Sequence, residues 1–144
     1  MTTDLTTTSI FVLEIDSVEM GSFRKVSGIE SESEIVEFKE VNKQGKTIIR
    51  KTPGNMKWSD ITLERRIDSS QALWEWRQQV IEGEITQARR NGSIVAKNAK
   101  MEEVARWNFT AGWPSKWSGA DFDAGANDIA TEKVIITHEG LVRA

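Results

Sequence analysis

The chain contains no cysteine, only two prolines and a single histidine among its 144 residues. Without cysteine, neither a disulfide framework nor a thiolate metal site can form. The sequence has no run of about 18 apolar residues, which a membrane-spanning helix requires. Its N-terminal residues are polar and lack the basic-then-apolar order of a secretory signal. We therefore expect synthesis in the cytoplasm without a signal peptide, and no membrane anchor.

Basic residues are too few for a protein dedicated to nucleic acid. The formal net charge is -3 at pH 7, whereas nucleic-acid-binding domains normally carry a basic excess. The length is that of a single domain with its own core. We expect one domain over residues 1–144, in which residues 1–9 form a flexible lead-in.

Motifs that carry catalysis or cofactor binding are also missing. The sequence has no Gly-x-Ser-x-Gly segment and no glycine-rich phosphate-binding motif. Its one histidine, His138, shares a strand face with Val134 and Ile136, which favours a strand-end histidine with a local partner over a general base. We predict that the protein is not an enzyme and that it uses no cofactor and no metal.

Glu30, Glu32 and Glu34 alternate along an extended segment and therefore project to one side of it. Three carboxylates can hold a hard cation, but the spacing and the glycine of a calcium loop are missing. A solvated or pore-facing acidic strand is the favoured interpretation.

Alternation of apolar and polar residues predicts several β-strands. In the clearest one, Ala105, Trp107, Phe109 and Ala111 share a face, and Pro114 is expected to end the strand. Weaker alternation occurs near residues 11–15, 23–29, 61–67, 94–96 and 134–136, and residues 30–41 are expected to be extended, with Val36 and Phe38 on one face. Large aromatic residues are expected to anchor the core and interfaces. These anchors are Trp76, Trp107, Phe109, Trp113 and Trp117.

One segment has helical spacing instead. Residues 68–71 have the arrangement of a capping box. Leu73 and Trp76 begin an apolar series at helical spacing, and Gly83 can close the helix. We predict one helix at about 68–82 that covers one end or side of a mostly antiparallel barrel.

Residues 42–57 are basic, contain two glycines and a proline, and are long for a hairpin connection. They also include Ile48 and Ile49, an apolar pair that a purely solvated loop does not need. Two interpretations remain open at this point: a mobile surface loop, or an arm that becomes ordered against a neighbouring subunit.

Short motifs spread over nearly the whole chain resemble the tail tube proteins of contractile phages and of extracellular contractile injection systems. They include Phe23-Arg-Lys-Val-Ser-Gly28, Ile61-Thr-Leu-Glu-Arg65, Arg106-Trp-Asn-Phe109, Trp113-Pro-Ser-Lys-Trp117 and His138-Glu-Gly-Leu141. No single motif is diagnostic, and the resemblance rests on their order along the chain.

This resemblance implies a mainly β protein: a small antiparallel β-barrel of about six strands, with one α-helix at about 68–82 and a long hairpin arm at about 42–57. It also implies six copies per ring and rings stacked into a hollow tube, which sheath contraction drives through a target envelope to convey cargo. The implied partners are further copies of the chain, a sheath protein, a baseplate hub or tube initiator, a tube terminator, and an effector protein or DNA in the lumen. The implied location is the assembled phage tail or extracellular particle, after synthesis in the bacterial cytoplasm.

The resemblance favours the arm interpretation of residues 42–57. The expected contact residues are Lys43, Lys46, Ile48, Ile49, Arg50 and Lys51. Opposite charges on the acidic segment 30–40 and this basic arm can set the register between copies. Glu30, Glu32 and Glu34 are the candidates for facing the lumen. Two alternatives stay open: a tube-initiating ring of the baseplate, and, in a different class, a stand-alone β-barrel binding module.

Overall fold

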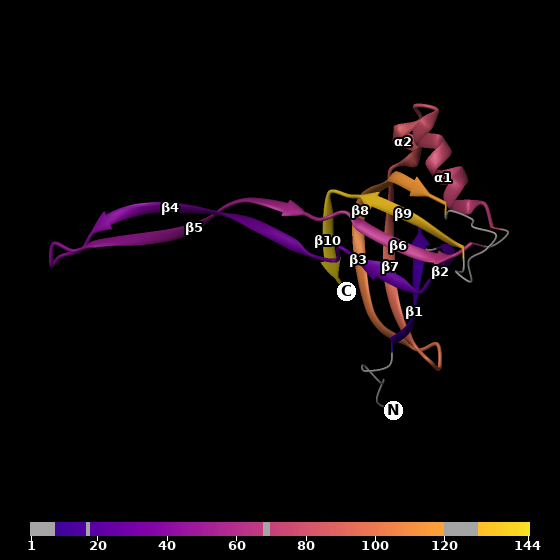
Figure 1. Cartoon of the computed structure of the whole chain (residues 1–144), viewed down its shortest axis with the longest axis horizontal. Coiled ribbons are helices and arrows are strands. Elements are labelled where there is room, and N and C mark those ends of the chain that lie inside the picture. Colours follow the sequence, from indigo (N-terminus) through magenta and orange to yellow (C-terminus); the bar gives the residue numbers. More distant parts are fainter. Residues whose placement is uncertain (1–7, 17, 68–69, 120–129) are drawn as a thin grey trace, which may run out of the picture. The chain divides into compact units, whose positions relative to one another are not determined.

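The structure is a computed structural model that describes residues 8–16, 18–67, 70–119 and 130–144. The described residues form ten strands and two helices, and every strand pairing is antiparallel (Figure 1). The chain divides into two compact units. The barrel unit is Met1–Ile29 with Asp60–Ala144, and the hairpin unit is Glu30–Ser59.

The barrel unit is a curled antiparallel sheet. Its strands are β1 Thr8–Ile15, β2 Val18–Phe23, β3 Lys25–Ser27, β6 Ile61–Arg66, β7 Arg90–Asn98, β8 Glu103–Ser118, β9 Thr131–Thr137 and β10 Gly140–Arg143. They are ordered β2–β1–β7–β8–β9–β6–β3, and β10 pairs with β8. β2 and β3 end this order, yet only Arg24 separates them in sequence. With β2–β3 and β9–β10 each counted as one bent strand, the unit is the expected small barrel of six strands, although its hydrogen-bond ladder is not fully closed.

The core fills the inside of this curled sheet. Alternate residues of β6 and β9 are buried, which is the pattern of strands with one face turned to a core. The buried core residues are Leu13, Ile15, Phe23, Ile61, Leu63, Leu73, Trp76, Ala88, Ile94, Phe109, Val134 and Ile136. The predicted alternation at residues 11–15, 61–67 and 134–136 therefore marks strands that contribute to this core.

Pro114 was expected to end its strand, but strand β8 continues through it to Ser118. Pro114 pairs with Ile136 of β9 at a register shift, and its side chain is fully buried. A proline is tolerated beside such an irregularity because the ladder is already interrupted there. The bend in β8 falls earlier, at Ala111, whose φ of 52° lies in the left-handed region.

Helix α1 (Ala72–Ile81) is shorter at its start than the predicted helix at 68–82. Of the expected capping box, residues 68 and 69 lie outside the described residues, and Gln71 makes no side-chain capping bond. The end agrees with the prediction: Gly83 has a φ of 82°, and its N–H donates to the Val80 carbonyl at 3.0 Å. A second short helix, α2 (Ile85–Ala88), was not predicted. Both helices pack against β8 (Figure 1).

The hairpin unit consists of β4 (Ser31–Val41) and β5 (Thr47–Trp58). The arm predicted at residues 42–57 is thus the tip and second strand of a longer hairpin whose first strand is the acidic segment. At the tip, the Asn42 side-chain oxygen accepts the N–H groups of Gln44 and Lys46 at 3.0 Å each, and Gly45 has a φ of 77°. Of the predicted lead-in at residues 1–9, residues 1–7 lie outside the described residues, and Thr8 begins β1.

Candidate assembly surfaces

The register of the hairpin sorts its side chains onto two faces. Residues directly opposite each other on antiparallel strands point to the same side, and successive residues point to opposite sides. The Phe38 face comprises Val36, Phe38, Glu40, Ile48, Arg50 and Thr52. The Ile49 face comprises Ile35, Glu37, Lys39, Val41, Thr47, Ile49, Lys51 and Pro53.

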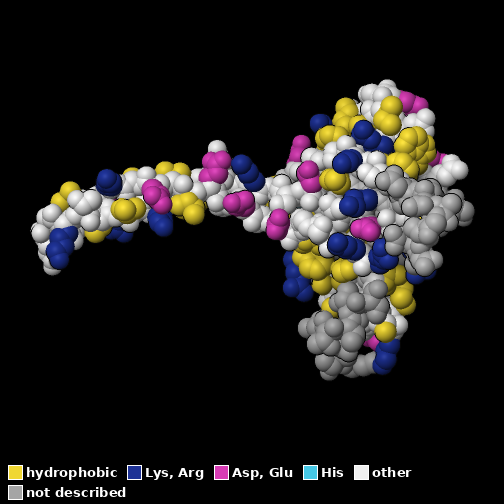
Figure 2. Space-filling view, in the orientation of Figure 1, with side chains coloured by type: hydrophobic (Ala, Val, Ile, Leu, Met, Phe, Trp, Pro, Cys, Tyr) yellow, Lys and Arg dark blue, Asp and Glu magenta, His cyan; other side chains and the backbone are white. Residues whose placement is uncertain are grey.

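Apolar side chains are exposed on both faces of the hairpin. On the Phe38 face, Val36 and Phe38 are 47% and 45% exposed; on the Ile49 face, Ile35, Val41 and Ile49 are 69%, 70% and 60% exposed. Figure 2 shows apolar and charged side chains mixed along the length of the hairpin.

The charges of the hairpin are paired across its own two strands. Arg50 Nε lies 3.0 Å from Glu40 Oε2, and Lys51 Nζ lies 3.9 Å from Glu37 Oε1. The acidic and basic segments thus lie opposite each other within one chain. Because these pairs are exposed, each contributes little to stability.

The three glutamates that were predicted to face a lumen lie at the start of this hairpin, and all are exposed. Glu30 Oε1 accepts the Ser59 hydroxyl at 3.0 Å. Glu32 is opposite Lys57, and Lys57 Nζ lies 3.9 Å from Glu34 Oε1. They form no group of three metal-ligating side chains, and no such group occurs elsewhere in the described residues.

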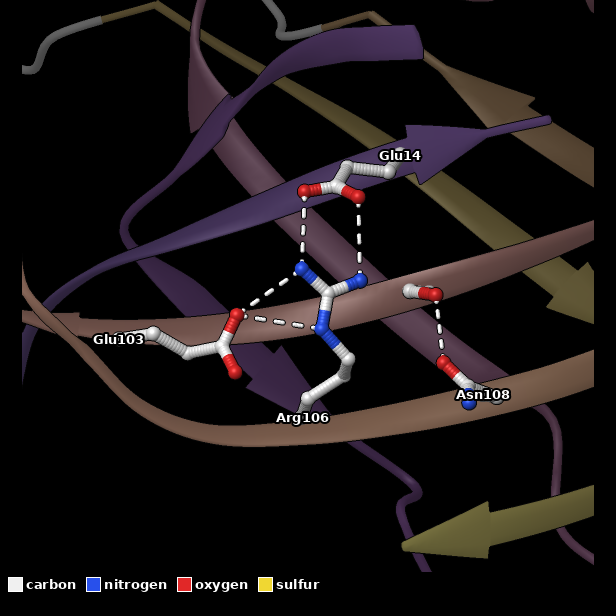
Figure 3. Close-up of polar contacts among 5 residues, drawn as sticks. Glu14, Glu103, Arg106 and Asn108 are labelled. Atoms are coloured by element: carbon white, nitrogen blue, oxygen red, sulfur yellow. Dashed lines mark hydrogen bonds and ion pairs between the residues drawn. The ribbon is translucent and has the colours of Figure 1, made fainter. Parts of the chain in front are cut away.

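The barrel unit has a polar face on the outer side of β1, β7 and β8. Arg106 on β8 donates to both carboxylate oxygens of Glu14 on β1, at 3.1 and 3.3 Å (Figure 3). It also donates twice to Glu103, at 3.1 and 2.9 Å. These bonds to Glu14, and secondarily to Glu103, raise the pKa of the Arg106 guanidinium above its ordinary value. Arginine, with its planar fork of donors, suits this arrangement better than lysine.

Two buried valines lie in the same cross-strand row as Arg106. Val12 on β1 pairs with Val95 on β7, which in turn pairs with Arg106. Both valines are at most 1% exposed, although they lie on the side of the sheet opposite Leu13 and Ile94 of the core. Long polar side chains cover apolar surface with their hydrocarbon stems. Two buried apolar side chains thus lie on the same face of the sheet as Arg106 and its ion pairs.

Inside the barrel, Arg65 on β6 and Glu132 on β9 form an ion pair at 2.8 Å. The second Glu132 oxygen accepts Trp117 Nε1 at 3.2 Å, and the Arg65 guanidinium lies 5.3 Å from the Phe23 ring centroid. Sequence reasoning missed this pair. The sequence did contain a signal for its burial: Arg65 falls on the same strand face as Ile61 and Leu63, which are both buried.

The five predicted aromatic anchors all contact the barrel core. Trp76 and Phe109 are buried within it, and Trp107, Trp113 and Trp117 are partly buried against it.

His138 is buried between β9 and β10, with its ring centroid 6.4 Å from that of Phe109. Near helix α1, a cavity of about 570 Å³ is lined in part by Ile15, Met20 and Trp76. Within the described residues, no helix is both long enough and apolar enough to span a membrane.

Comparison with protein families identifies the class. The model of the T4-like virus tail tube protein gp19 family matches residues 7–142. The chain therefore belongs to this tail tube family. A search of curated proteins finds no significant relative.

Solved structures share the fold. A chain of the extended sheath–tube complex of PVC, an extracellular contractile injection system, has a TM-score of 0.76 and 20% identity, covering 99% of this chain and 91% of that one. A chain of the tube-terminating cap of the anti-feeding prophage has a TM-score of 0.73 and 19% identity, covering 100% and 94%. Hcp1 from Flavobacterium johnsoniae has a TM-score of 0.56 and 17% identity, covering 94% of each chain. The resemblance noted in the sequence is thus confirmed, and the protein is a tail tube protein with the fold of these injection-system chains.

Proposed function

We propose that the protein is the repeating unit of a hollow inner tube. Six copies form a ring, rings stack along an axis, and a contracting sheath drives the tube through a target envelope with cargo inside. Membership of the tail tube family and the fold shared with a chain of a sheath–tube complex support this proposal. Head-to-tail contacts close into a ring when the rotation closes, while stacked rings extend indefinitely.

The observation that carries the assembly proposal is the hairpin unit. It exposes apolar side chains on strands that have no core of their own, and an isolated two-stranded hairpin is marginally stable in water. Contact with a neighbouring copy would bury these side chains. In this proposal the contact residues are Lys43, Lys46, Ile48, Ile49, Arg50 and Lys51.

The role proposed for the barrel unit is mechanical. Its strands are paired around a continuous core, and ion pairs lie both inside the barrel and on its outer face. A unit of this kind transmits force without local unfolding better than one built of loops, because its backbone hydrogen bonds are inside a packed sheet. The proposed partners are a surrounding sheath, a baseplate hub or initiator, a terminator at the tube end, and an effector protein or DNA in the bore.

Shortening the hairpin tests the assembly proposal. Replacing residues 40–48 with Asn-Gly places a two-residue turn between Lys39 and Ile49, which already pair across the hairpin. Asn-Gly is a favoured sequence for a two-residue hairpin turn. The variant is expected to fold and to remain monomeric, whereas the full chain forms rings or tubes under negative-stain microscopy. The barrel unit is checked by circular dichroism and thermal unfolding.

The matched control is Met101→Ser, which removes an apolar side chain of similar exposure (53%) from the β7–β8 turn. It is expected to leave assembly unchanged. Normal tubes from the shortened variant would exclude residues 40–48 of the hairpin as the contact, and a full chain that stays monomeric at high concentration would exclude the tube itself.

Glu30, Glu32 and Glu34 remain the proposed lumen residues. Because the chain has no cysteine, a single cysteine at position 32 gives a clean labelling site. In assembled tubes that cysteine should react with a small maleimide and resist a bulky polyethylene glycol maleimide. Rapid labelling by the bulky reagent in intact tubes would place Glu32 outside the bore.

The number of copies per particle separates a main tube protein from a tube-initiating ring. A main tube protein is present in as many rings as the tube is long, whereas an initiating ring is present once. Quantitative mass spectrometry of purified particles, with sheath protein as the internal reference, measures this ratio. We expect the chain to be about as abundant as the sheath.

A further inference from the structure

We propose that the barrel unit binds an acidic segment of a different protein on the outer face of β3, β6, β9 and the second half of β8. This basic face comprises Lys25, Ser27, Thr62, Glu64, Arg66, Lys116, Ser118, Thr131, Lys133 and Ile135. Such binding goes beyond the proposed function, because it does not require the chain to form a tube.

The strand register gathers the basic side chains of this face around Lys133. Lys133 is directly opposite Glu64 of β6, and Glu64 is opposite Lys25 of β3. Arg66 and Lys116 lie on the two diagonals to Lys133, at positions about 7–8 Å away. Figure 2 shows the resulting group of Lys and Arg side chains over β6 and β9.

The charges of this basic group are not compensated within the chain. Over the residues that the structure describes, no ion pair is formed by the four exposed basic side chains of the face, Lys25, Arg66, Lys116 and Lys133. The one carboxylate of the face, Glu64, lies 3.4 Å from Arg24 instead. Exposed charges of one sign without a counter-charge attract an anionic partner.

The charge of the rest of the chain favours a short acidic segment over nucleic acid. The basic face has four basic side chains and one acidic side chain, a net charge of +3. Residues 30–59 have six basic and five acidic side chains, a net charge of +1, so the barrel unit carries -4 of the chain's -3, and -7 outside the basic face. A nucleic acid extends past the face and is repelled by this surrounding charge, whereas a short acidic segment covers only the face. The face also has no aromatic side chain on which a base could stack.

The acidic strand β4 of another copy is a poorer occupant, because its carboxylates are already engaged. Glu40 lies 3.0 Å from Arg50, and Glu37 lies 3.9 Å from Lys51. Moving these carboxylates to the basic face would replace one exposed pair by another, with little gain in free energy. A segment of a different protein whose carboxylates are solvated loses no such pair.

Short side chains between the basic ones let a partner approach the sheet. Ser27, Thr62 and Ile135 form one cross-strand row, which ends at Lys116. Each ion pair formed on such an exposed face contributes little and is screened by salt. We therefore expect binding that is weak, reversible and lost at high ionic strength.

Binding of a fluorescently labelled peptide of consecutive glutamates to the full chain, measured by fluorescence anisotropy, tests this inference. Lys116→Gln combined with Lys133→Gln should weaken binding about fivefold, because two exposed ion pairs are lost. The matched control, Lys97→Gln combined with Lys100→Gln, removes the same charge from the other sheet of the barrel. It should weaken binding less than about twofold, because in about 0.1 M salt a charge more than about 10 Å away is largely screened. Circular dichroism checks that each variant is folded.

Carbodiimide coupling gives a second readout that locates the peptide. Its carboxylates should form amide bonds with the side-chain nitrogens of Lys116 and Lys133 in preference to those of Lys97 and Lys100, as mapped by mass spectrometry. Coupling without this preference would overturn the inference.

Equal weakening by the two barrel variants would mean that the peptide responds to net charge alone, which would also overturn it. A larger effect of Lys43→Gln combined with Lys46→Gln would place the site at the hairpin tip. Tighter binding of duplex DNA, or of a peptide of residues 30–41, would assign the face to nucleic acid or to another copy. Each of these results contradicts the inference but leaves the proposed function intact, because microscopy of the unmodified chain tests tube formation separately.

Discussion

Arg65 and Glu132 form a hydrogen-bonded ion pair inside the barrel, with 2.8 Å between Arg65 Nε and Glu132 Oε1 and side chains only 6% and 5% exposed. The Arg65 side chain, on β6, also lies beside β2, the strand at the other end of the sheet. A Cβ at Gly21 of β2 would lie 2.5 Å from Arg65 Nη1. One side chain thus links β9 with β2, across the part of the barrel where the hydrogen-bond ladder is open.

Removing one partner of this pair is expected to destabilise the monomer strongly. Glu132→Gln removes the Glu132 charge beside the buried Arg65 guanidinium, and breaking one partner of a buried ion pair costs about 3–5 kcal/mol. The double variant Arg65→Met with Glu132→Leu removes both charges and should recover most of that loss. The free energy of unfolding in urea, measured for Arg65→Met, for Glu132→Leu and for the double variant, gives the coupling energy.

The neighbouring pair of Arg24 and Glu64 provides the control. Its atoms lie 3.4 Å apart, and the Arg24 side chain is 52% exposed. Arg24→Met should cost less than about 1 kcal/mol, because solvent screens an exposed pair. If Glu132→Gln costs no more than Arg24→Met, the buried pair does not hold the barrel together.

The bidentate bond of Arg106 to Glu14 predicts a different response. Arg106→Lys keeps the charge but loses the planar fork of donors, and we expect a loss of about 1 kcal/mol, since the site is partly exposed. Because the folded-state pKa of Arg106 is raised, the stability it contributes is complete below the unfolded-state pKa. It is lost only as the pH rises through the raised value.

Both of those pKa values lie far above neutrality for an arginine. The difference in unfolding free energy between the unmodified chain and the Arg106→Lys variant should therefore stay constant from about pH 6 to about pH 9. Urea unfolding at several pH values checks this. If this difference in unfolding free energy disappears between about pH 6 and about pH 9, the Arg106 guanidinium is not the group that causes it.

Two glycines make room for the buried Phe109 ring. A Cβ on Gly92 would lie 2.5 Å from this ring, and a Cβ on Gly112 would lie 2.4 Å from it. Gly92→Ala and Gly112→Ala should each destabilise the monomer by about 1–3 kcal/mol, because the packed core cannot absorb a methyl group without strain. Gly140→Ala is the control, since nothing lies within 4 Å of its added Cβ. Thermal unfolding of the three variants measures the difference, and equal melting temperatures would contradict the packing argument.

The core strands could be predicted from the sequence because burial imposes a period. Val134 and Ile136 on β9 alternate with more exposed residues and proved to be core, as did Leu13 and Ile15 on either side of Glu14 in β1. The bend of β8 at Ala111 had no such signal. A left-handed φ at an alanine is set by the pairing on either side of it, which is tertiary information. The clearer breaker, Pro114, was therefore wrongly taken as the end of the strand.

The extended segment expected at residues 30–41 agrees with β4 (Ser31–Val41), but its pairing with β5 in one long hairpin was not predicted. Almost all residues of the hairpin are exposed on both faces, so burial imposes no pattern that shows where the second strand begins and ends. The acidic segment and the basic arm could be recognised by charge, and Glu37 opposite Lys51 shows that this charge contrast was a signal for pairing within the chain. Helix α2, with four residues, is too short to carry a helical period.

Two tryptophans on helix α1 allow a last prediction about how the helices are held. Trp76 is buried, and its Nε1 donates to the Ala88 carbonyl of α2 at 2.7 Å; Trp74 is 39% exposed and meets Trp117 edge to face. Trp76→Phe leaves that buried carbonyl without this donor, which costs about 1–3 kcal/mol. Trp74→Phe should cost less than about 1 kcal/mol, because it removes a half-exposed ring edge.

Hydrogen exchange locates the effect as well as its size. In the Trp76→Phe variant, amides of α2 and the turn at Gly83 should lose protection, while those of β6 and β9 should keep it, because local opening follows the contacts that are lost. In Trp74→Phe, protection of α2 should match that of the unmodified chain. Equal loss of protection at α2 in both variants would mean that general packing of α1, rather than the bond to Ala88, holds the second helix in place.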